Sequence, residues 1–331
     1  MPSATEVSQL TAKGREVRSA FADRLTAELG RVVVGQQGVV ERVLIGLLTR
    51  GHLLIEGVPG IAKTLLAKSV AESVRADFSR VQFTPDLLPA DLIGTLIYDQ
   101  RNRTFVPRQG PVFTNFLLAD EINRAPAKVQ SALLEAMQER QETIGDETWK
   151  LEEPFVVLAT QNPIEQEGTY PLPEAQVDRF MMKLRMGFPE LDDERVILKR
   201  MANFAVPRAE PVLGPEEIAT ARDAVEAVYV DDRIRDYILS LVRATRDPGA
   251  FGVDIAGLVE HGASPRASLD LYRAARARAF LEDRDFTAPE DVKHLAPDVM
   301  RHRLILSYEA EAEEVDGDEI VRRVLDAVEV P

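Results

Sequence analysis

The sequence predicts an α/β fold in which a central parallel sheet of five strands carries a phosphate-binding loop and is followed by a small all-α domain. Three observations support this prediction. An apolar run at 52–56 leads through a glycine-bearing loop into a helical pattern. A second apolar run, at 115–119, ends in two adjacent acids. Beyond about residue 210 the apolar residues recur almost only at helical spacing.

Composition limits the classes of protein that fit. A chain of 331 residues should hold about two domains of roughly 150 residues each. The net charge of −15 argues against broad binding to nucleic acids or anionic membranes. The absence of cysteine excludes disulfides, thiolate metal sites and cysteine nucleophiles. No apolar run approaches the ~18 residues of a membrane span, and the first residues do not resemble a signal peptide, so we expect a cytoplasmic protein.

The predicted phosphate-binding loop lies between the strand at 52–56 and the helix that follows it. It consists of Gly57, Val58, Pro59, Gly60, Ile61, Ala62, Lys63 and Thr64, with Leu65 opening the helix. Backbone N–H groups at such a turn and helix start point at anionic oxygens. Lys63 would reach the β- and γ-phosphates of a nucleotide, and the Thr64 hydroxyl would bind Mg²⁺.

One position of this loop departs from the usual pattern, and a simpler interpretation is open. Ala62 precedes Lys63 where glycine is usual, and its methyl group is tolerable if φ is negative. The alternative is an ordinary glycine turn between strand and helix that binds nothing.

The segment upstream of the loop is a candidate contact for a nucleotide base. A predicted helix at 4–29, ending at Gly30, is followed by the apolar run Val32–Val34 and by Gly35. Val34 and Gly35 could pack against an adenine ring. The pattern fits equally well if these valines simply belong to the core.

The adjacent acids Asp120 and Glu121 are the second chemical signal. At the carboxyl end of a parallel strand they would lie beside the phosphate site. Asp120 would then hold the Mg²⁺ shell through water, and Glu121 would polarise the water that attacks the γ-phosphate. Alternatively, the strand ends in a solvated acidic turn.

Two further polar residues follow predicted elements of the first domain. Asn162 comes after the buried strand at 155–160, where an amide could orient the water beside Glu121, although Asn before Pro is also common turn chemistry. Arg179 follows a short predicted helix and precedes a last strand, 181–188. An exposed Arg is usually solvated, and Arg179 gains a role only if a neighbouring subunit presents a phosphate to it.

The predicted domains are 1–190, a linker at 191–210 marked by prolines, and a helical domain at 211–331. Hairpins are predicted near 96–106 and 141–153. Ser264 should cap a helix that begins at Pro265, which places Arg266 in its first turn; the simpler alternative is a solvated surface Arg. We expect the acidic stretch 309–319 to be a solvated loop. The helices predicted in this domain are 215–228, 231–245, 265–281, 289–301 and 317–329.

The order of these motifs resembles that of the MoxR family of AAA+ ATPases over about residues 32–306. The matching stretches are Gly-Val-Pro-Gly-Ile-Ala-Lys-Thr, Leu-Leu-Ala-Asp-Glu-Ile-Asn-Arg-Ala-Pro, Ala-Thr-Gln-Asn-Pro, Pro-Glu-Ala-Gln-Val-Asp-Arg-Phe and Gly-Ala-Ser-Pro-Arg. Ala62 before Lys63 is similar to the MoxR form of the loop. The resemblance therefore implies an AAA+ αβα core with a helical lid.

The same resemblance implies a role for each matching residue. Lys63 and Thr64 would belong to Walker A, and Asp120 and Glu121 to Walker B. Asn162 would be sensor 1, Arg179 an arginine finger acting on a neighbour's ATP, and Arg266 sensor 2. Gln82 would couple Glu121 to the oligomeric state, and the two hairpins would line a pore.

The resemblance also implies cofactors and partners. We expect ATP and Mg²⁺ as cofactors and a homo-oligomeric ring, a hexamer, as the working form. The clients would be proteins with von Willebrand factor A domains, during metal or cofactor insertion or the maturation of complexes. Neither membrane insertion nor a nucleic-acid partner is expected.

Two other classes of function compete with a remodelling ATPase. A small-molecule kinase or GTPase would also use a phosphate loop, but no Asn-Lys-x-Asp motif is present and the adjacent acids favour hydrolysis. An ATP-dependent DNA motor or a nucleotide-switched binding module is the other alternative, and the net charge of −15 weakens its DNA form.

Overall fold

The computed structural model describes residues 21–58, 60–163, 168–202 and 207–331. Contacts divide the chain into an α/β unit, residues 24–179 and 184–218, and a helical unit that contains residues 21–23, 180–183 and 219–331. Each unit is described by itself below.

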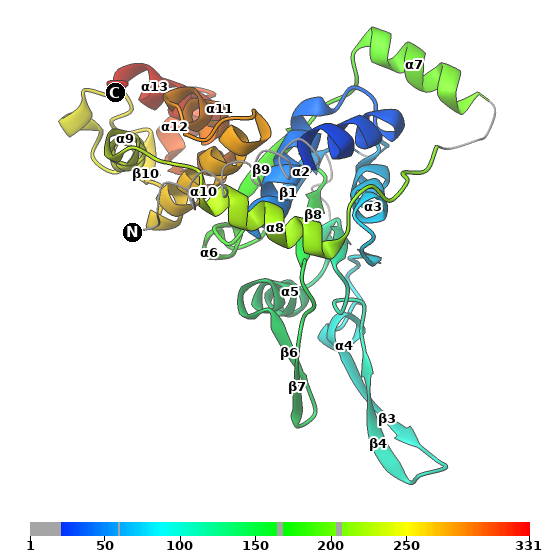
Figure 1. Ribbon diagram of the computed structural model, residues 1–331. Helices are drawn as coiled ribbons and strands as arrows, with labels where there is room; N and C mark the ends of the chain where they lie inside the picture. The colour runs from blue at the N-terminus through cyan, green and yellow to red at the C-terminus, as the bar shows by residue number, and fades with distance from the viewer. Residues whose placement is uncertain (1–20, 59, 164–167, 203–206) are drawn as a thin grey trace, which may run out of the picture. The chain divides into compact units, whose positions relative to one another are not determined.

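A five-stranded sheet forms the centre of the α/β unit, as the sequence predicts (Figure 1). The strand order is β2-β5-β8-β1-β9, and β5 pairs in parallel with both β2 and β8, which in turn pairs in parallel with β1. The strands are β1 (Leu53–Gly57), β2 (Phe78–Gln82), β5 (Phe116–Asp120), β8 (Val156–Gln161) and β9 (Met182–Met186, whose first two residues are grouped with the helical unit). Nearly every residue of the three central strands is buried, as expected where helices cover both faces of a parallel sheet.

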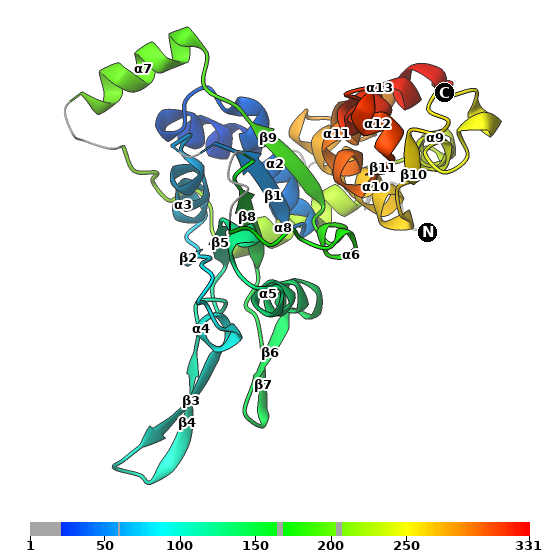
Figure 2. The ribbon, with the colours of Figure 1, turned by 180° about the vertical axis from the view of Figure 1, so that it is seen from behind.

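Helices and two hairpins complete the α/β unit. The helices are α2 (Gln37–Thr49), α3 (Lys63–Ser73), α4 (Pro89–Ile93), α5 (Ala127–Glu139), α6 (Glu174–Val177) and α7 (Leu191–Met201), with a 3₁₀ turn, η1, at Ile122–Arg124. The predicted hairpins are confirmed as β3 (Gly94–Asp99) with β4 (Thr104–Gln109), and β6 (Gln141–Ile144) with β7 (Glu147–Lys150). Both project from the unit in the two opposite views (Figures 1 and 2).

The helical unit contains the five helices predicted from the sequence. They are α8 (Pro215–Glu226, which begins in the α/β unit), α9 (Asp232–Ala244), α10 (Pro265–Leu281), α11 (Pro289–Met300) and α13 (Gly317–Ala327). The 3₁₀ turns η2 (Pro248–Phe251) and η3 (Arg301–Arg303) lie between them. The unit is not purely helical, because β10 (Val259–His261) pairs with β11 (Ile305–Leu306).

The acidic stretch 309–319 is not a simple loop, contrary to the prediction. Its first residues belong to α12 (Tyr308–Ala312), and residues from Gly317 onward belong to α13. Two local features explain α12. The Ser307 side chain accepts a hydrogen bond from the Ala310 N–H, and Ala310 is fully buried. Charge alone therefore misled the sequence interpretation.

Two boundaries also differ from their predictions. Residues 21–32 are helical, so the helix passes Gly30 and continues to Val32, which is buried; residues 4–20 of the predicted helix lie outside the described residues. The predicted linker contains α7, whose first turn is acidic and last turn basic, as the helix dipole favours. Beyond α7, the N–H groups of Val212 and Leu213 donate to the Ser73 carbonyl at the end of α3, which ties this stretch to the α/β unit.

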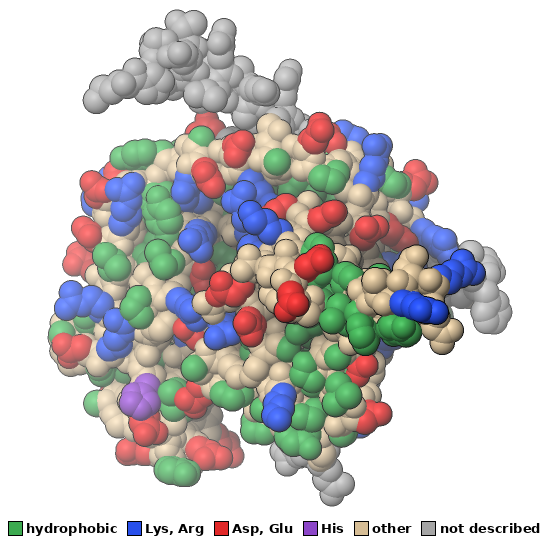
Figure 3. Space-filling model, turned by 90° about the horizontal axis from the view of Figure 1, so that it is seen from below, with side chains coloured by type: hydrophobic (Ala, Val, Ile, Leu, Met, Phe, Trp, Pro, Cys, Tyr) green, Lys and Arg blue, Asp and Glu red, His purple; other side chains and the backbone are tan. Residues whose placement is uncertain are grey.

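Surface charge is mixed. Figure 3 shows acidic and basic side chains interspersed with hydrophobic ones. Among the described residues, no helix has the length and apolar character that a membrane span requires.

Candidate active site

The glycine-bearing loop connects β1 to α3, as the sequence predicts. A Cβ on Gly57 would lie 2.6 Å from the Met186 carbonyl oxygen, so the close approach of β9 requires glycine there. Gly60 has φ +87°, which also favours glycine. Val58 is described, whereas Pro59 lies outside the described residues.

Ala62 adopts a conformation that the sequence interpretation did not expect. Its φ is +65°, in the left-handed region, so the negative φ at which its methyl group would be readily tolerated is not adopted. Ala62 is the N-cap of α3, and this backbone turn directs the chain from the loop into the helix, whose first residues are Lys63, Thr64 and Leu65. The first N–H groups of α3 lack partners within the helix and are available to an anion.

Lys63 lies among opposite charges at this loop. Its Nζ donates a hydrogen bond to the Gly57 carbonyl, 2.7 Å away, so the side chain folds back over the loop. Burial lowers the pKa of the Lys63 ammonium, and the carboxylates of Asp120 and Glu121 oppose that shift. The loop and the two acids therefore meet at one site, as the sequence predicts.

Asp120 ends β5 and is held by two neighbouring strands. Its Oδ2 accepts hydrogen bonds from Arg80 Nη2 (2.6 Å) and Nε (3.1 Å), from β2. Its Oδ1 accepts a bond of 2.6 Å from the Thr160 hydroxyl of β8. The carboxylate is thus fixed at the carboxyl end of the sheet.

Glu121 follows immediately, at a left-handed φ of +56°. Its Oε2 accepts hydrogen bonds from Gln82 Nε2 (2.7 Å) and Arg124 Nη1 (3.0 Å). Its backbone N–H donates to the Thr160 hydroxyl at 2.9 Å. Gln82, which the resemblance linked to Glu121, is therefore in direct contact with it.

Three residues of this cluster were not predicted from the sequence: Arg80, Arg124 and Thr160. Thr160 is fully buried and connects the two acidic residues. Its hydroxyl donates to the Asp120 carboxylate and accepts from the backbone N–H of Glu121. Arg80 is two residues before Gln82 on β2, and β2 pairs with β5 so that Gln82 lies opposite Asp120. Only knowledge of the strand order could have revealed the contacts of Arg80 and Thr160, whereas Arg124 is three residues after Glu121 in the chain.

Asn162 comes directly after β8 and is buried. In the sheet, β8 lies between β5, which ends at Asp120, and β1, which leads into the glycine-bearing loop. Asn162 therefore follows the strand between them. This placement suits an amide that orients a small polar molecule near them.

The donor groups suit a hydrated Mg²⁺. This ion is typically held by one or two protein oxygens together with substrate phosphates and waters. The Thr64 hydroxyl and the Asp120 carboxylate are of that chemical type. Among the described residues there is no group of three or more His, Cys, Asp or Glu side chains that could hold a metal ion.

A cavity of about 540 Å³ opens beside the loop within the α/β unit. Val34, Gly60, Ile61, Ala62 and Leu65 are among its lining residues, so the predicted valine segment and the loop share one pocket. The pocket is mainly apolar, as a base-binding site requires. Helix α7 adds Glu194, Ile197, Leu198 and Arg200 to the lining, a contribution that the sequence interpretation missed.

Gly35 lies next to this pocket rather than in its lining. Its φ is +73°, and a Cβ there would lie 2.6 Å from Asp193 Oδ2 of α7. The left-handed φ favours glycine there, and a contact between Gly35 and a base stays a prediction.

The two predicted arginines occupy element boundaries. Arg179 is half-buried after α6, and its N–H donates to the Gln176 carbonyl. Arg266 belongs to the helical unit and is exposed in the first turn of α10. The predicted cap is confirmed, since the Ser264 side chain accepts the Arg266 N–H at 3.2 Å.

Comparisons with known proteins agree with this fold and site. Residues 52–182 match the profile of the ATPase family associated with various cellular activities (AAA), and residues 254–324 match the AAA lid domain. A phosphate loop and an acid pair on a parallel sheet, followed by a helical lid, define an AAA+ ATPase.

Named relatives narrow the class further. The chain is 49% identical to chaperone MoxR1 of Mycobacterium tuberculosis over 97% of its length and 85% of that protein. It is 34% identical to the MoxR protein of Methylorubrum extorquens over 94% of its length and 95% of that protein. A crystal structure from Cytophaga hutchinsonii, described as an inferred ATPase, matches with a TM-score of 0.93 and 47% identity over 99% of this chain and 100% of that one. The chain belongs to the MoxR family of AAA+ ATPases.

Proposed function

We propose that this protein hydrolyses ATP in the presence of Mg²⁺ and uses the energy, as a ring, to remodel partner protein complexes. The observation that carries the proposal is the meeting of Lys63, Asp120 and Glu121 at the carboxyl end of the sheet. The chaperone name of its relative in Mycobacterium tuberculosis supports the remodelling part.

The residues divide the chemistry between binding and proton transfer. Backbone N–H groups of the loop and of the first turn of α3 bind the phosphates, and Lys63 exchanges its bond to Gly57 for phosphate oxygens. The adenine ring occupies the apolar pocket that contains Val34, Ile61 and Ile197. Mg²⁺, when bound near Thr64 and Asp120, neutralises charge on the phosphates.

Glu121 is the general base of the hydrolysis. Its carboxylate accepts a proton from the attacking water, and Asn162 orients that water. Gln82 and Arg124 hold the same carboxylate here, at 2.7 and 3.0 Å from Oε2. We infer that these bonds keep the Glu121 carboxylate in place until they are exchanged for bonds to water.

The remaining arginines couple the site to assembly. Arg179 completes the site of a neighbouring subunit as an arginine finger, and Arg266 contacts the γ-phosphate from the lid. An arginine finger in trans is worth roughly 10³–10⁵ in rate, so an isolated subunit should bind ATP and hydrolyse it poorly. We place the working ring, a hexamer, in the cytoplasm, with von Willebrand factor A domain proteins as clients and metal or cofactor insertion as a process served.

The Glu121→Gln variant tests the assignment. We expect it to bind ATP with the parent affinity and to lose about 10²–10⁴ in hydrolysis rate, because an amide cannot take the proton. The measurements are binding of a fluorescent ATP analogue and release of phosphate. Glu147→Gln, an exposed residue of β7, is the control. Hydrolysis by Glu121→Gln at the parent rate would show that another group is the base.

A further inference from the structure

Residues 180–183 are held by the helical unit, although the chain on either side of them belongs to the α/β unit. Their carbonyl groups accept hydrogen bonds from three consecutive residues of η3. The Phe180 carbonyl accepts from His302 Nε2 and from Arg303 Nη2, both at 2.9 Å. The Met181 carbonyl accepts from Arg303 Nη1 at 3.3 Å, and that of Lys183 from Arg301 Nη1 at 2.7 Å. One of the points at which the chain passes from the α/β unit to the helical unit therefore lies between Arg179 and Phe180.

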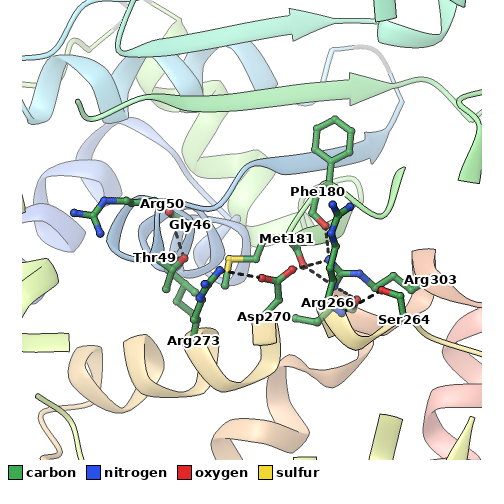
Figure 4. Close-up of polar contacts among 12 residues, drawn as sticks. Gly46, Thr49, Arg50, Phe180, Met181, Ser264, Arg266, Asp270, Arg273 and Arg303 are labelled. Atoms are coloured by element: carbon green, nitrogen blue, oxygen red, sulfur yellow. Dashed lines mark hydrogen bonds and ion pairs between the residues drawn. The ribbon is translucent and has the colours of Figure 1, made fainter. Parts of the chain in front are cut away.

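Arg303 is the central donor of this cluster. Its side chain is only 1% exposed, and its guanidinium also donates to the Val299 carbonyl at 2.7 Å. The Asp270 carboxylate lies 2.6 Å from Nη2 and balances the buried charge. Figure 4 shows Arg303 between Asp270 and the main chain of Phe180 and Met181. A buried guanidinium with an ion-pair partner and several carbonyl acceptors has one favourable geometry.

His302 contributes a second, neutral donor. Burial and the neighbouring Arg303 charge keep the pKa of His302 well below its usual value, so the ring is uncharged. Its bond to the Phe180 carbonyl therefore requires the proton on Nε2. Two side chains thus fix the same carbonyl.

Asp270 connects this cluster to the start of α10. It lies four residues, about one helical turn, after Arg266. Arg266 and Asp270 therefore share one face of α10. Phe180 lies one residue, about 3.8 Å between Cα atoms, after Arg179. The Asp270–Arg303 ion pair thus joins α10, the helix that carries Arg266, to the main chain that follows Arg179.

We propose that Arg303 and Asp270 are positioning residues for Arg179: they fix the main chain that follows Arg179 to α10, the helix that carries Arg266. The proposal rests on the proposed function, in which Arg179 acts on the ATP of a neighbouring subunit. A shift of α10 after phosphate release then moves Arg179, the arginine finger that acts on the ATP of the neighbouring subunit. A misplacement of about 1 Å at a catalytic group can cost about 10² in rate, so a small shift is sufficient.

The variants Arg303→Lys and Asp270→Asn test this coupling. Lys keeps the charge but loses the planar fork, and Asn keeps the size but loses the charge. We expect homogeneous rings of either variant, like rings of Arg179→Ala, to lose turnover with unchanged affinity for a fluorescent ATP analogue. Arg278→Lys, which alters a buried ion pair of the same helix with Asp291, is the control and should keep turnover.

Mixed rings separate a defect in the donated finger from a defect in the subunit's own site. Glu121→Gln subunits cannot hydrolyse ATP but donate an intact finger. We expect Arg303→Lys subunits to regain turnover when they are mixed with Glu121→Gln subunits, and to gain nothing when mixed with Arg179→Ala subunits. Asp270→Asn should behave in the same way.

Other outcomes overturn the proposal. Parent turnover by both variants would show that the cluster does not position Arg179. Recovery with Arg179→Ala but not with Glu121→Gln would place the defect in the variant's own site. Failure of both variants to assemble would make the cluster purely structural. If Arg179→Ala and Glu121→Gln do not complement each other while the parent hydrolyses ATP, the trans finger itself is wrong, and a parent without ATPase activity refutes the proposed function.

Discussion

At the scale of single residues, three of the four donors that hold the two acids of the site, Arg80, Gln82 and Thr160, are distant from them in sequence. Asp120 contacts Arg80 of β2 and Thr160 of β8, whereas Glu121 contacts Gln82 and Arg124. A side chain with several partners loses less entropy when it meets a substrate, because it is already ordered. The side chains of Asp120 and Glu121 are therefore already ordered before ATP binds.

Thr160 is the residue on which this arrangement depends most directly. Thr160→Val removes the hydroxyl and keeps the shape, which leaves Asp120 Oδ1 and the Glu121 N–H without this partner. We expect a loss of about 1–3 kcal/mol in the free energy of unfolding, measured by urea titration, and a lower kcat for ATP. Thr160→Ser restores the hydroxyl and should restore both. Unchanged stability and kcat in Thr160→Val would contradict this role.

At the scale of elements, helix α7 shapes the pocket beside the loop. It interrupts the predicted linker, and it supplies four residues to the pocket lining. Helix amphipathicity alone did not indicate this contact, because an apolar residue on a helix can face any partner. The position of α7 against the valine segment gives the pocket its second apolar wall.

The Ile197→Glu variant tests that wall. A carboxylate in the pocket should weaken ATP and ADP equally, by about tenfold or roughly 1.4 kcal/mol, because both nucleotides carry the same base. Isothermal titration calorimetry with each nucleotide measures the effect. Val196→Glu, on the same helix but outside the lining, should leave both affinities unchanged. Weakening of ATP alone would assign Ile197 to the phosphates instead.

The hairpin after α5 contains a carboxyl group that links stability to pH. Burial, and secondarily the Glu135 carboxylate, raises the pKa of Glu142 in β6 from 4.5 to about 7. Between these values the folded state binds more protons than the unfolded state, so the contribution of Glu142 to stability falls as pH rises from 4.5 to 7.

Glu142→Gln removes this titration. We expect the variant to raise Tm relative to the parent at pH 8 and to change it little at pH 4, as measured by thermal unfolding at both values. Glu147→Gln, on the exposed partner strand, is the matched control and should show no such pH dependence. An equal change of Tm at both pH values would mean that hydrogen bonding, rather than charge, dominates at Glu142.

At the scale of the whole molecule, the net charge of −15 weighs against broad binding to DNA. The β3–β4 hairpin instead exposes apolar side chains, among them Phe105, which is 66% exposed. Such a surface suits contact with protein chains.

This balance of charge gives a direct test against the DNA-motor alternative. We expect duplex or single-stranded DNA to leave the ATPase rate unchanged between 50 and 200 mM salt, roughly the range in which phosphate contacts weaken most visibly. The measurement is steady-state phosphate release. A stimulation by DNA that disappears as salt rises would favour the motor.

The sequence by itself determined the elements and the chemical residue types. Strand, loop and helix follow from local patterns of apolar residues and glycine, and the acids at 120–121 and the Ser264 cap are short-range signals. Four strands of the sheet, at 52–56, 115–119, 155–160 and 181–188, and the helices of the second domain were therefore predicted to within a few residues. The acidic stretch at 309–319 was not, because a buried alanine outweighed its charge.

Only the tertiary structure decided which of these residues meet. The bonds from Thr160 and Arg80 to Asp120 depend on the strand order β2-β5-β8, and those from Arg303 to Phe180 join residues 123 positions apart. The left-handed φ of Ala62 likewise follows from how the chain must turn from β1 into α3. Periodicity reports which face of an element is apolar, whereas long-range pairing is selected by the packing of the whole core.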